Sequence, residues 1–185
     1  AVQLGGPSGG CVPAKHLNMP IDYESLKEID CIMGSGAMVI LDEDACMVDT
    51  AKFFLEFDRD ESCGQCLPCR RGLPLMIEIL ERIVQGRGEI EDLDHLKSLA
   101  TTVKKTALCA LGQTAASPTL STLRHFRNEY EAHIIQQRCP AGVCASLFDT
   151  RCRNACPIHQ DIPAYMALTK EGQIKEAYQV IKQTN

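Results

Sequence analysis

The spacing of hydrophobic residues divides the chain into an irregular first part and a strongly periodic second part. Up to about residue 50, glycine-rich loops separate short apolar runs, and the run at residues 37–41 has the length and composition of a buried strand. From there onward, apolar residues recur every three or four positions, which is the period of an amphipathic helix. The pattern predicts a β-containing segment followed by a helical domain.

Four helices are predicted in the periodic part, beginning with a short one over residues 51–57. Asp49 or Thr50 is in the position to cap it. This helix carries three of the five phenylalanines, Phe53, Phe54 and Phe57. Their expected role is to form a helix face in the core of a bundle, where they would also limit the access of water to a nearby cofactor.

The other three helices are longer. One covers residues 73–84 and stops before a pair of glycines, and the next covers residues 93–103 and ends in two lysines that suit the negative end of its dipole. The last begins with Ser117 as N-cap and Pro118 at its first position, and its apolar face continues to Ile134. Together these elements predict an α+β fold that is mostly α, with a four-helix bundle.

Charge and cysteine usage narrow the function classes. The chain has 19 basic and 24 acidic residues, a formal net charge of -5 and no continuous basic stripe, so no nucleic-acid partner is expected. No apolar run approaches the length of about 20 residues that spans a membrane. An odd number of cysteines, 11, and the absence of a signal peptide predict a reducing, cytoplasmic location where thiols stay free for metal.

Three cysteines at C-x2-C-x2-C spacing, Cys63, Cys66 and Cys69, form the most informative motif of the chain. A cubane [4Fe-4S] cluster needs four cysteine ligands, and ferredoxin ligand runs begin with this spacing. The isolated Cys109, which follows after one helical hairpin, is the candidate for the fourth ligand. Zinc is the competing interpretation, although four-cysteine zinc sites usually consist of two C-x2-C pairs, and the second pair is missing here.

A second group of cysteines lies near the end of the chain. It consists of Cys139, Cys144, Cys152 and Cys156, and together with His133 it offers the mixed nitrogen and sulfur ligands that zinc binds. The C-x3-C-P ending also matches the tail of the ferredoxin run, so an iron–sulfur cluster is the alternative, and a redox-sensing dithiol is a third interpretation. His133 could equally be a solvated residue at a helix end.

The remaining cysteines and histidines show no metal-ligand spacing. Free cysteine commonly behaves as a small buried hydrophobe, so core packing is expected for Cys11, Cys31 and Cys46. Surface or packing roles are expected for His16, His95, His125 and His159. Because the chain starts at Ala1 without a methionine and stops at Asn185 directly after a helix-like stretch, we expect it to be an internal piece of a longer polypeptide.

Residues 5–144 resemble the C-terminal half of the NADH-binding flavoprotein subunit of respiratory complex I. The similarity is sharpest in residues 61–70, 108–114 and 126–133. The flavoprotein subunits of NAD(P)-linked [FeFe]-hydrogenases and formate dehydrogenases resemble the chain still more closely. In this family an FMN and NADH domain precedes a small ubiquitin-like domain and a four-helix bundle that holds one [4Fe-4S] cluster.

The resemblance implies three parts: a partial ubiquitin-like (SLBB-type) segment at residues 1–49, a cluster-bearing bundle at 50–137 and a cysteine-rich segment at 138–185. It also implies that the cluster receives single electrons from FMN through the ligands Cys63, Cys66, Cys69 and Cys109. Because the FMN and NADH domain is absent from the sequence, the chain alone should not oxidise NADH. The implied partners are the upstream FMN domain, a thioredoxin-like ferredoxin subunit, and a hydrogenase or formate dehydrogenase subunit.

Residues 152–184 resemble the start of the iron–sulfur domain in the glutamate synthase small subunit and in dihydropyrimidine dehydrogenase. In those proteins the ligands of two clusters are shared with cysteines further downstream, which this sequence lacks. The sequence therefore predicts an electron-transfer fragment of an NAD(P)H-dependent flavin and iron–sulfur oxidoreductase. The alternative is a helical interaction module that zinc holds together without redox activity.

Overall fold

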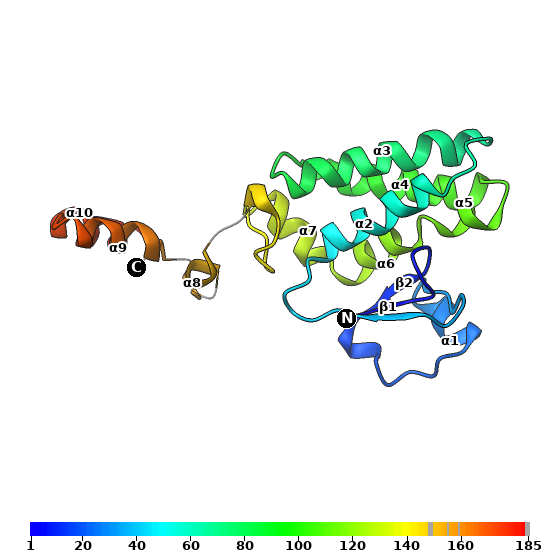
Figure 1. The fold of residues 1–185 in the computed structure, drawn as a ribbon, viewed down its shortest axis with the longest axis horizontal. Helices are drawn as coiled ribbons and strands as arrows, with labels where there is room; N and C mark the ends of the chain where they lie inside the picture. Colours follow the sequence, from blue (N-terminus) through cyan, green and yellow to red (C-terminus); the bar gives the residue numbers. More distant parts are fainter. Residues whose placement is uncertain (148–149, 155, 159, 184–185) are drawn as a thin grey trace. The chain divides into compact units, whose positions relative to one another are not determined.

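The computed structural model describes residues 1–147, 150–154, 156–158 and 160–183. The chain forms two compact units, residues 1–147 and residues 148–185. The first contains a small sheet and a helical bundle, and the second contains short helices (Figure 1). The predicted fold class, α+β and mostly α, is confirmed.

The first unit begins with a three-stranded antiparallel sheet in the order β2-β1-β3. Its elements are β1 (Val2–Leu4), β2 (Gly10–Val12), the 3-10 helix η1 (Ala14–His16), α1 (Tyr23–Glu28) and β3 (Met38–Ile40). Gln3 pairs with Cys11 on one side and with Val39 on the other. A small core of its own, centred on Leu4 and Leu26, supports this segment.

The strand expected at residues 37–41 exists as β3, but the prediction that it is buried was wrong. β3 pairs only with β1 among the described strands, and its three side chains are 46–84% exposed. A strand at the edge of a sheet has one neighbour, and an apolar run cannot distinguish an edge strand from a central one.

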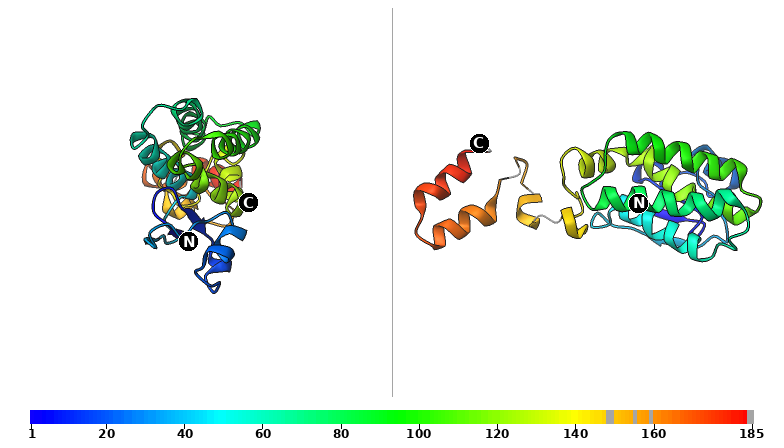
Figure 2. Two further views of the ribbon diagram at one scale, coloured as in Figure 1. Left: turned by 90° about the vertical axis from the view of Figure 1, so that its right-hand side faces the viewer. Right: turned by 90° about the horizontal axis from the view of Figure 1, so that it is seen from above.

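The helical part of the first unit is a bundle built on the long helix α3. Its elements are α2 (Met47–Asp60), α3 (Leu67–Val84), α4 (Glu91–Thr106), α5 (Ala110–Thr114), α6 (Ser117–His125) and α7 (Arg127–Ile134). α3 packs against both α2 and α4, and α6 packs against α2 and α4 (Figure 2). α3 and α4 agree with the two predicted long helices, and Gly86, with φ of +71°, follows the end of α3.

α2 is longer than predicted and begins earlier. Its N-cap is Cys46, whose sulfur accepts a hydrogen bond from the Asp49 backbone N–H, so the prediction of Asp49 or Thr50 as cap was wrong. Only Phe54 of the three phenylalanines lies in the core, whereas Phe53 and Phe57 are 62% and 46% exposed.

The predicted last helix is divided in two at Phe126. The backbone leaves the helical region there, with ψ of +30°, so that α6 ends at His125 and α7 starts at Arg127. The N-cap of α6 is Ala116, one residue before the predicted Ser117, which lies inside the helix together with Pro118. The break changes the direction of the chain and so determines where His133, near the end of α7, points.

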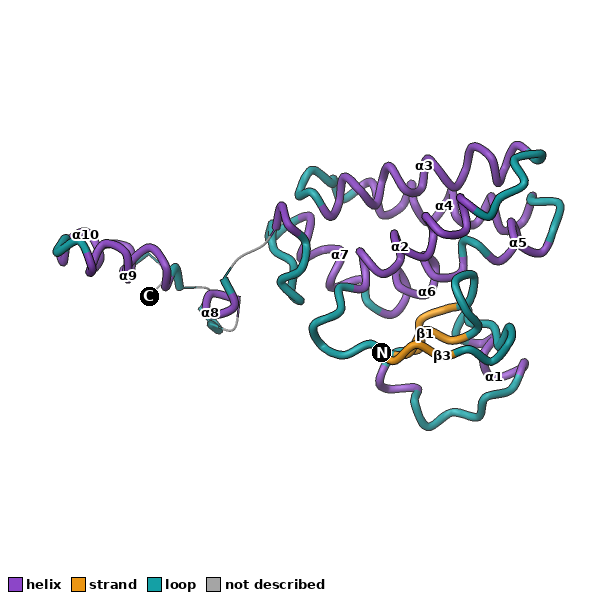
Figure 3. The backbone as a smooth tube through the Cα atoms, viewed as in Figure 1, coloured by secondary structure: helices purple, strands orange, loops and turns teal. Residues whose placement is uncertain are grey.

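The sheet segment lies next to the bundle (Figure 3), and hydrogen bonds attach the two. The Ser8 hydroxyl donates to the buried Asp58 carboxylate of α2 over 2.7 Å, and the Cys11 backbone N–H donates to Ser121 of α6 over 2.9 Å. The two parts of the first unit are therefore joined through buried polar contacts.

The second unit contains α8 (Arg151–Asn154), α9 (Ile162–Lys170) and α10 (Ile174–Lys182), which follow η2 (Ala145–Leu147) at the end of the first unit. α9 and α10 pack against each other, and the Asp161 carboxylate caps α9 by accepting from the Ala164 backbone N–H over 3.1 Å. Across the described ranges, no helix is long and apolar enough to cross a membrane.

Candidate metal centres

The loop between α2 and α3 presents the three clustered cysteines. The end of α2 anchors it, because the Ser62 backbone N–H donates to the Arg59 carbonyl over 3.1 Å. Gly64 turns the chain with φ of +70°, a conformation that glycine adopts without strain. Cys66 is then the N-cap of α3, and Cys69 lies in the first turn of that helix.

Cys109 reaches the same region from the other side, as the N-cap of α5. The sulfur of Cys66 accepts hydrogen bonds from the backbone N–H groups of Leu108 and Cys69, which lower the pKa of this thiol. Gly112 of α5 packs so tightly that a Cβ added to it would lie 2.7 Å from Ala107 and 3.7 Å from the sulfur of Cys69. The two loops therefore meet at this end of the bundle.

Cys69 is the buried member of this group. Burial raises the pKa of its thiol, and the negative charge of Cys66, Cys109 and Cys63 raises it further, whereas a hydrogen bond from Ser62 lowers it. All four predicted ligands thus lie close enough to interact electrostatically. Such mutual repulsion favours a cationic centre that takes all four as thiolates.

The four cysteines also differ in exposure in a way that suits electron exchange. Cys63 and Cys109 are exposed and Cys66 is half-buried, while the neighbouring Leu67 and Leu108 are 63% and 83% exposed. A centre held here would have one side in the protein and one near the surface. We call this group the loop site.

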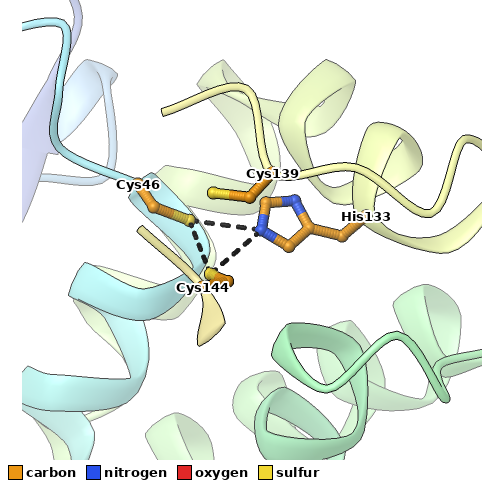
Figure 4. A group of neighbouring side chains, drawn as sticks. All are labelled: Cys46, His133, Cys139 and Cys144. Carbon is orange, nitrogen blue, oxygen red and sulfur yellow. Dashed lines mark hydrogen bonds between the residues drawn. The ribbon is translucent and has the colours of Figure 1, made fainter. Parts of the chain in front are cut away.

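A second group of candidate ligands lies at the opposite end of α2 (Figure 4). Cys46 precedes α2, His133 comes from α7, and Cys139 and Cys144 come from the segment after α7. Their donor atoms all lie within 4.8 Å of one another, and all four side chains are buried. We call this group the buried site.

The distances in the buried site match those around a zinc ion. His133 Nε2 lies 3.3 Å from the sulfur of Cys46 and 3.4 Å from that of Cys144, and the two sulfurs are 3.7 Å apart. Bonds of about 2.3 Å to sulfur and 2.0–2.1 Å to nitrogen place the donors of tetrahedral zinc about 3.5–3.8 Å apart. A cubane cluster would hold its ligands further apart, because its own iron and sulfide atoms lie between them.

The loop site differs on this point. Within the part of the chain that the structure describes, the buried site is the one group of three or more ligands with donor atoms this close. No three of the sulfurs of Cys63, Cys66, Cys69 and Cys109 form so compact a group.

A hydrogen bond orients the imidazole of the buried site. His133 Nδ1 lies 2.7 Å from the backbone carbonyl oxygen of Glu129, which can only accept, so Nδ1 carries the proton. Nε2 then keeps its lone pair and points it at the three sulfurs. Metal-binding histidines are usually oriented by such a contact.

Without a cation the three thiols of the buried site cannot ionise independently. Hydrogen bonds to Cys139 and Cys144 raise the pKa of Cys46, and the reciprocal bonds from Cys144 and Cys46 lower the pKa of Cys139. Binding of a divalent cation would favour the thiolate form of all three.

The buried site changes one expectation from the sequence and decides between the two interpretations of His133. Cys46, expected to be a core residue, is the fourth member, and His133 is fully buried instead of lying at a solvated helix end. Cys152 and Cys156 are outside the group and belong to the second unit. Cys11 and Cys31 are buried, in agreement with core packing, and His159 lies outside the described residues.

Two family models match the chain. The NADH-ubiquinone oxidoreductase-F iron–sulfur binding region covers residues 49–133, which include all four cysteines of the loop site. The model described as dihydropyrimidine dehydrogenase domain II, 4Fe-4S cluster, covers residues 120–185. The second match agrees with the resemblance noted for the end of the chain.

Similar proteins agree with these models. The NADP-reducing hydrogenase subunit HndC of Solidesulfovibrio fructosivorans is 58% identical over 80% of this chain and 30% of its own length. The NADH-quinone oxidoreductase F subunit of Mycobacterium tuberculosis is 40% identical over 74% of the chain and 31% of its own. An NAD+-reducing [NiFe]-hydrogenase crystal structure has a TM-score of 0.65 and 31% identity, over 72% of the chain and 23% of its own. The chain thus spans a third or less of the length of these relatives.

Proposed function

Since the chain belongs to the family of NADH-ubiquinone oxidoreductase F subunits and carries their iron–sulfur binding region at residues 49–133, we propose that it relays single electrons within an NAD(P)H-dependent oxidoreductase. The observation that carries this proposal is the loop site, where two separate loops bring four cysteines together near the surface. The relatives include quinone oxidoreductases and hydrogenases, so electron transfer is the activity that they share.

In this proposal Cys63, Cys66, Cys69 and Cys109 ligate one [4Fe-4S] cluster. Such a cluster exchanges one electron at a time without bond breaking. The chain's own residues hold the thiolates in place, and the backbone N–H groups of Leu108 and Cys69 stabilise negative charge on Cys66. The exposed side of the site brings the centre within reach of a partner.

We propose a structural zinc ion for Cys46, His133, Cys139 and Cys144. The site is closed, with four protein donors and no open position, which is typical of structural zinc and not of catalytic zinc. It would join the start of α2 to the end of α7 and to the segment at residues 139–144. For Cys152 and Cys156, a second iron–sulfur cluster that needs further cysteines remains the proposal, supported by the match at residues 120–185.

The partners follow from the relatives, which are subunits of multi-subunit hydrogenases and quinone oxidoreductases. We propose an FMN domain of the same polypeptide as electron donor. A thioredoxin-like ferredoxin subunit, and a hydrogenase or formate dehydrogenase subunit, would be neighbours in the assembly. A cytoplasmic location is proposed because all 11 cysteines are free thiols. The division of the chain into three parts, with boundaries at residues 49/50 and 137/138, is also part of this proposal.

Metal and acid-labile sulfide analysis of anaerobically purified protein tests the proposal, with the visible spectrum recorded on the same sample. We expect about four irons, four sulfides and one zinc per chain in a brown protein. Zinc without sulfide would overturn the electron relay and favour a helical module that zinc holds together. Cys31→Ala, a buried cysteine outside both sites, is the matched control and should keep both metals.

A further inference from the structure

A side-chain hydroxyl lies against one ligand of the loop site. Ser62 Oγ is 3.1 Å from the sulfur of Cys69, and the same oxygen is 3.2 Å from the backbone nitrogen of Gly64. Ser62 is half-buried and Cys69 is buried, so the contact lies on the protein side of the site. This is a polar contact to a ligand sulfur from a side chain that is not itself a ligand.

The direction of the hydrogen bond follows from the two neighbours. The Gly64 N–H can only donate, so it occupies a lone pair of the Ser62 oxygen and leaves the hydroxyl hydrogen free to turn toward Cys69. A cysteine that ligates iron is a thiolate, which can only accept. Ser62 is therefore the donor and Cys69 the acceptor when the site is loaded.

The hydroxyl is held in position by its backbone. The Ser62 N–H donates to the Arg59 carbonyl at the end of α2, and Gly64 continues the chain through a left-handed turn. The donor is thus fixed between the end of a helix and a tight turn, which keeps it directed at sulfur.

We propose that Ser62 raises the reduction potential of the cluster through this hydrogen bond. The inference rests on the proposed function, because it requires Cys69 to ligate the cluster. Reduction adds one electron and increases the negative charge on the ligand sulfurs, while every iron–sulfur bond and the Ser62 proton stay in place. A donor to sulfur stabilises the more negative state, so Ser62 is a positioning and tuning residue for electron transfer.

The test is a potentiometric titration of the anaerobically purified protein, followed by electron paramagnetic resonance of the reduced cluster. In Ser62→Ala we expect the ratio of reduced to oxidised cluster at a fixed potential to fall about tenfold, a shift of about 59 mV to lower potential for one electron. Iron content should stay unchanged. Ser98→Ala, which removes an exposed hydroxyl from α4, should leave the potential unchanged.

A pair of variants with similar shape isolates the hydroxyl. Ser62→Thr keeps the donor and should retain the wild-type potential, whereas Ser62→Val lacks it and should shift the potential as Ser62→Ala does. An unchanged potential in Ser62→Ala or Ser62→Val with full iron would overturn the inference. Loss of iron from both Ser62→Ala and Ser62→Val, with full iron in Ser62→Thr, would also overturn the inference. The hydroxyl would then be needed to retain the cluster. Absence of iron and sulfide in the wild-type protein would instead overturn the proposed function.

Discussion

His133 Nε2 lies 3.3 Å from the sulfur of Cys46, although 87 residues separate the two in the chain. The contact connects the end of α7 with the residue that caps α2. A metal ion between them would close a loop that includes most of the bundle and so restrict the unfolded chain more than a local site would. For this reason we expect a metal ion in the buried site to stabilise the bundle that surrounds the loop site. It would do so without contacting the four cysteines of the loop site.

Replacing Cys46 by alanine should remove the zinc ion and destabilise the protein. We expect a loss of about 3–5 kcal/mol in the free energy of unfolding, because loss of a structural metal is among the few changes with effects this large. Thermal or urea unfolding, combined with zinc analysis, measures it. Cys31→Ala removes an equally buried thiol, and each residue is 2% exposed. Equal losses of stability in the two variants would contradict a metal at Cys46.

Replacing Cys109 by alanine should remove the cluster and leave the zinc ion in place. Cys109 is exposed and caps only the short helix α5, so its removal should cost little packing. We expect iron and sulfide to fall to background levels, zinc to stay at one per chain, and helix content by circular dichroism to change little. Full iron content in this variant would remove Cys109 from the ligand set.

The grouping of the four loop-site cysteines could be predicted from sequence because they lie in motifs with a recognisable spacing. Three of them occupy one short stretch of chain. The helices α3 and α4, which lie between this stretch and Cys109, have a clear helical spacing of apolar residues. The buried site could be predicted only in part. His133, Cys139 and Cys144 lie within twelve residues of one another, whereas Cys46 comes from another part of the chain and has no local partner at ligand spacing.

The missing signal for Cys46 has a physical origin. Its place in the site depends on where α2 begins and on the break at Phe126, which turns α7. Helix ends are the least certain part of a sequence-based prediction, because tertiary contacts decide them. An isolated buried cysteine is indistinguishable from a core residue until its neighbours in space are known, and the same holds for a buried histidine at the end of a helix.

Asp58 should make the stability of the protein fall as the pH rises from about 4 to about 6. Its carboxyl is 1% exposed, accepts one hydrogen bond from Ser8 and has a second oxygen with no partner among the described residues. Burial raises its pKa from the ordinary 3.8 to about 6, so the folded state retains the proton in this range while the unfolded state releases it.

Asp58→Asn removes this charge and should be more stable than the wild type at pH 7, by up to about 3 kcal/mol. The difference should narrow toward pH 4, where the wild-type carboxyl is protonated in both states. Urea unfolding of both proteins at each pH measures it, and any effect of acid on the metal sites is common to the two. Asp60→Asn, an exposed neighbour paired with Arg59, should show no gain at pH 7. A constant difference between Asp58→Asn and the wild type at all pH values would contradict the assignment.

Gly112→Ala should weaken the loop site by displacing α5, the helix whose N-cap is Cys109. An added Cβ would lie 2.7 Å from the Cβ of Ala107, which ends α4, and 3.7 Å from the sulfur of Cys69, so α5 must move away from Ala107 to accept it. We expect a loss of about 1–3 kcal/mol in stability, as for other overpacked positions, together with faster loss of iron to a chelator. The neighbouring Thr114→Ala is the control, since its hydroxyl bonds only to carbonyls of its own helix. If Gly112→Ala and Thr114→Ala released iron at the same rate, the close approach of α5 would have no role in holding the cluster.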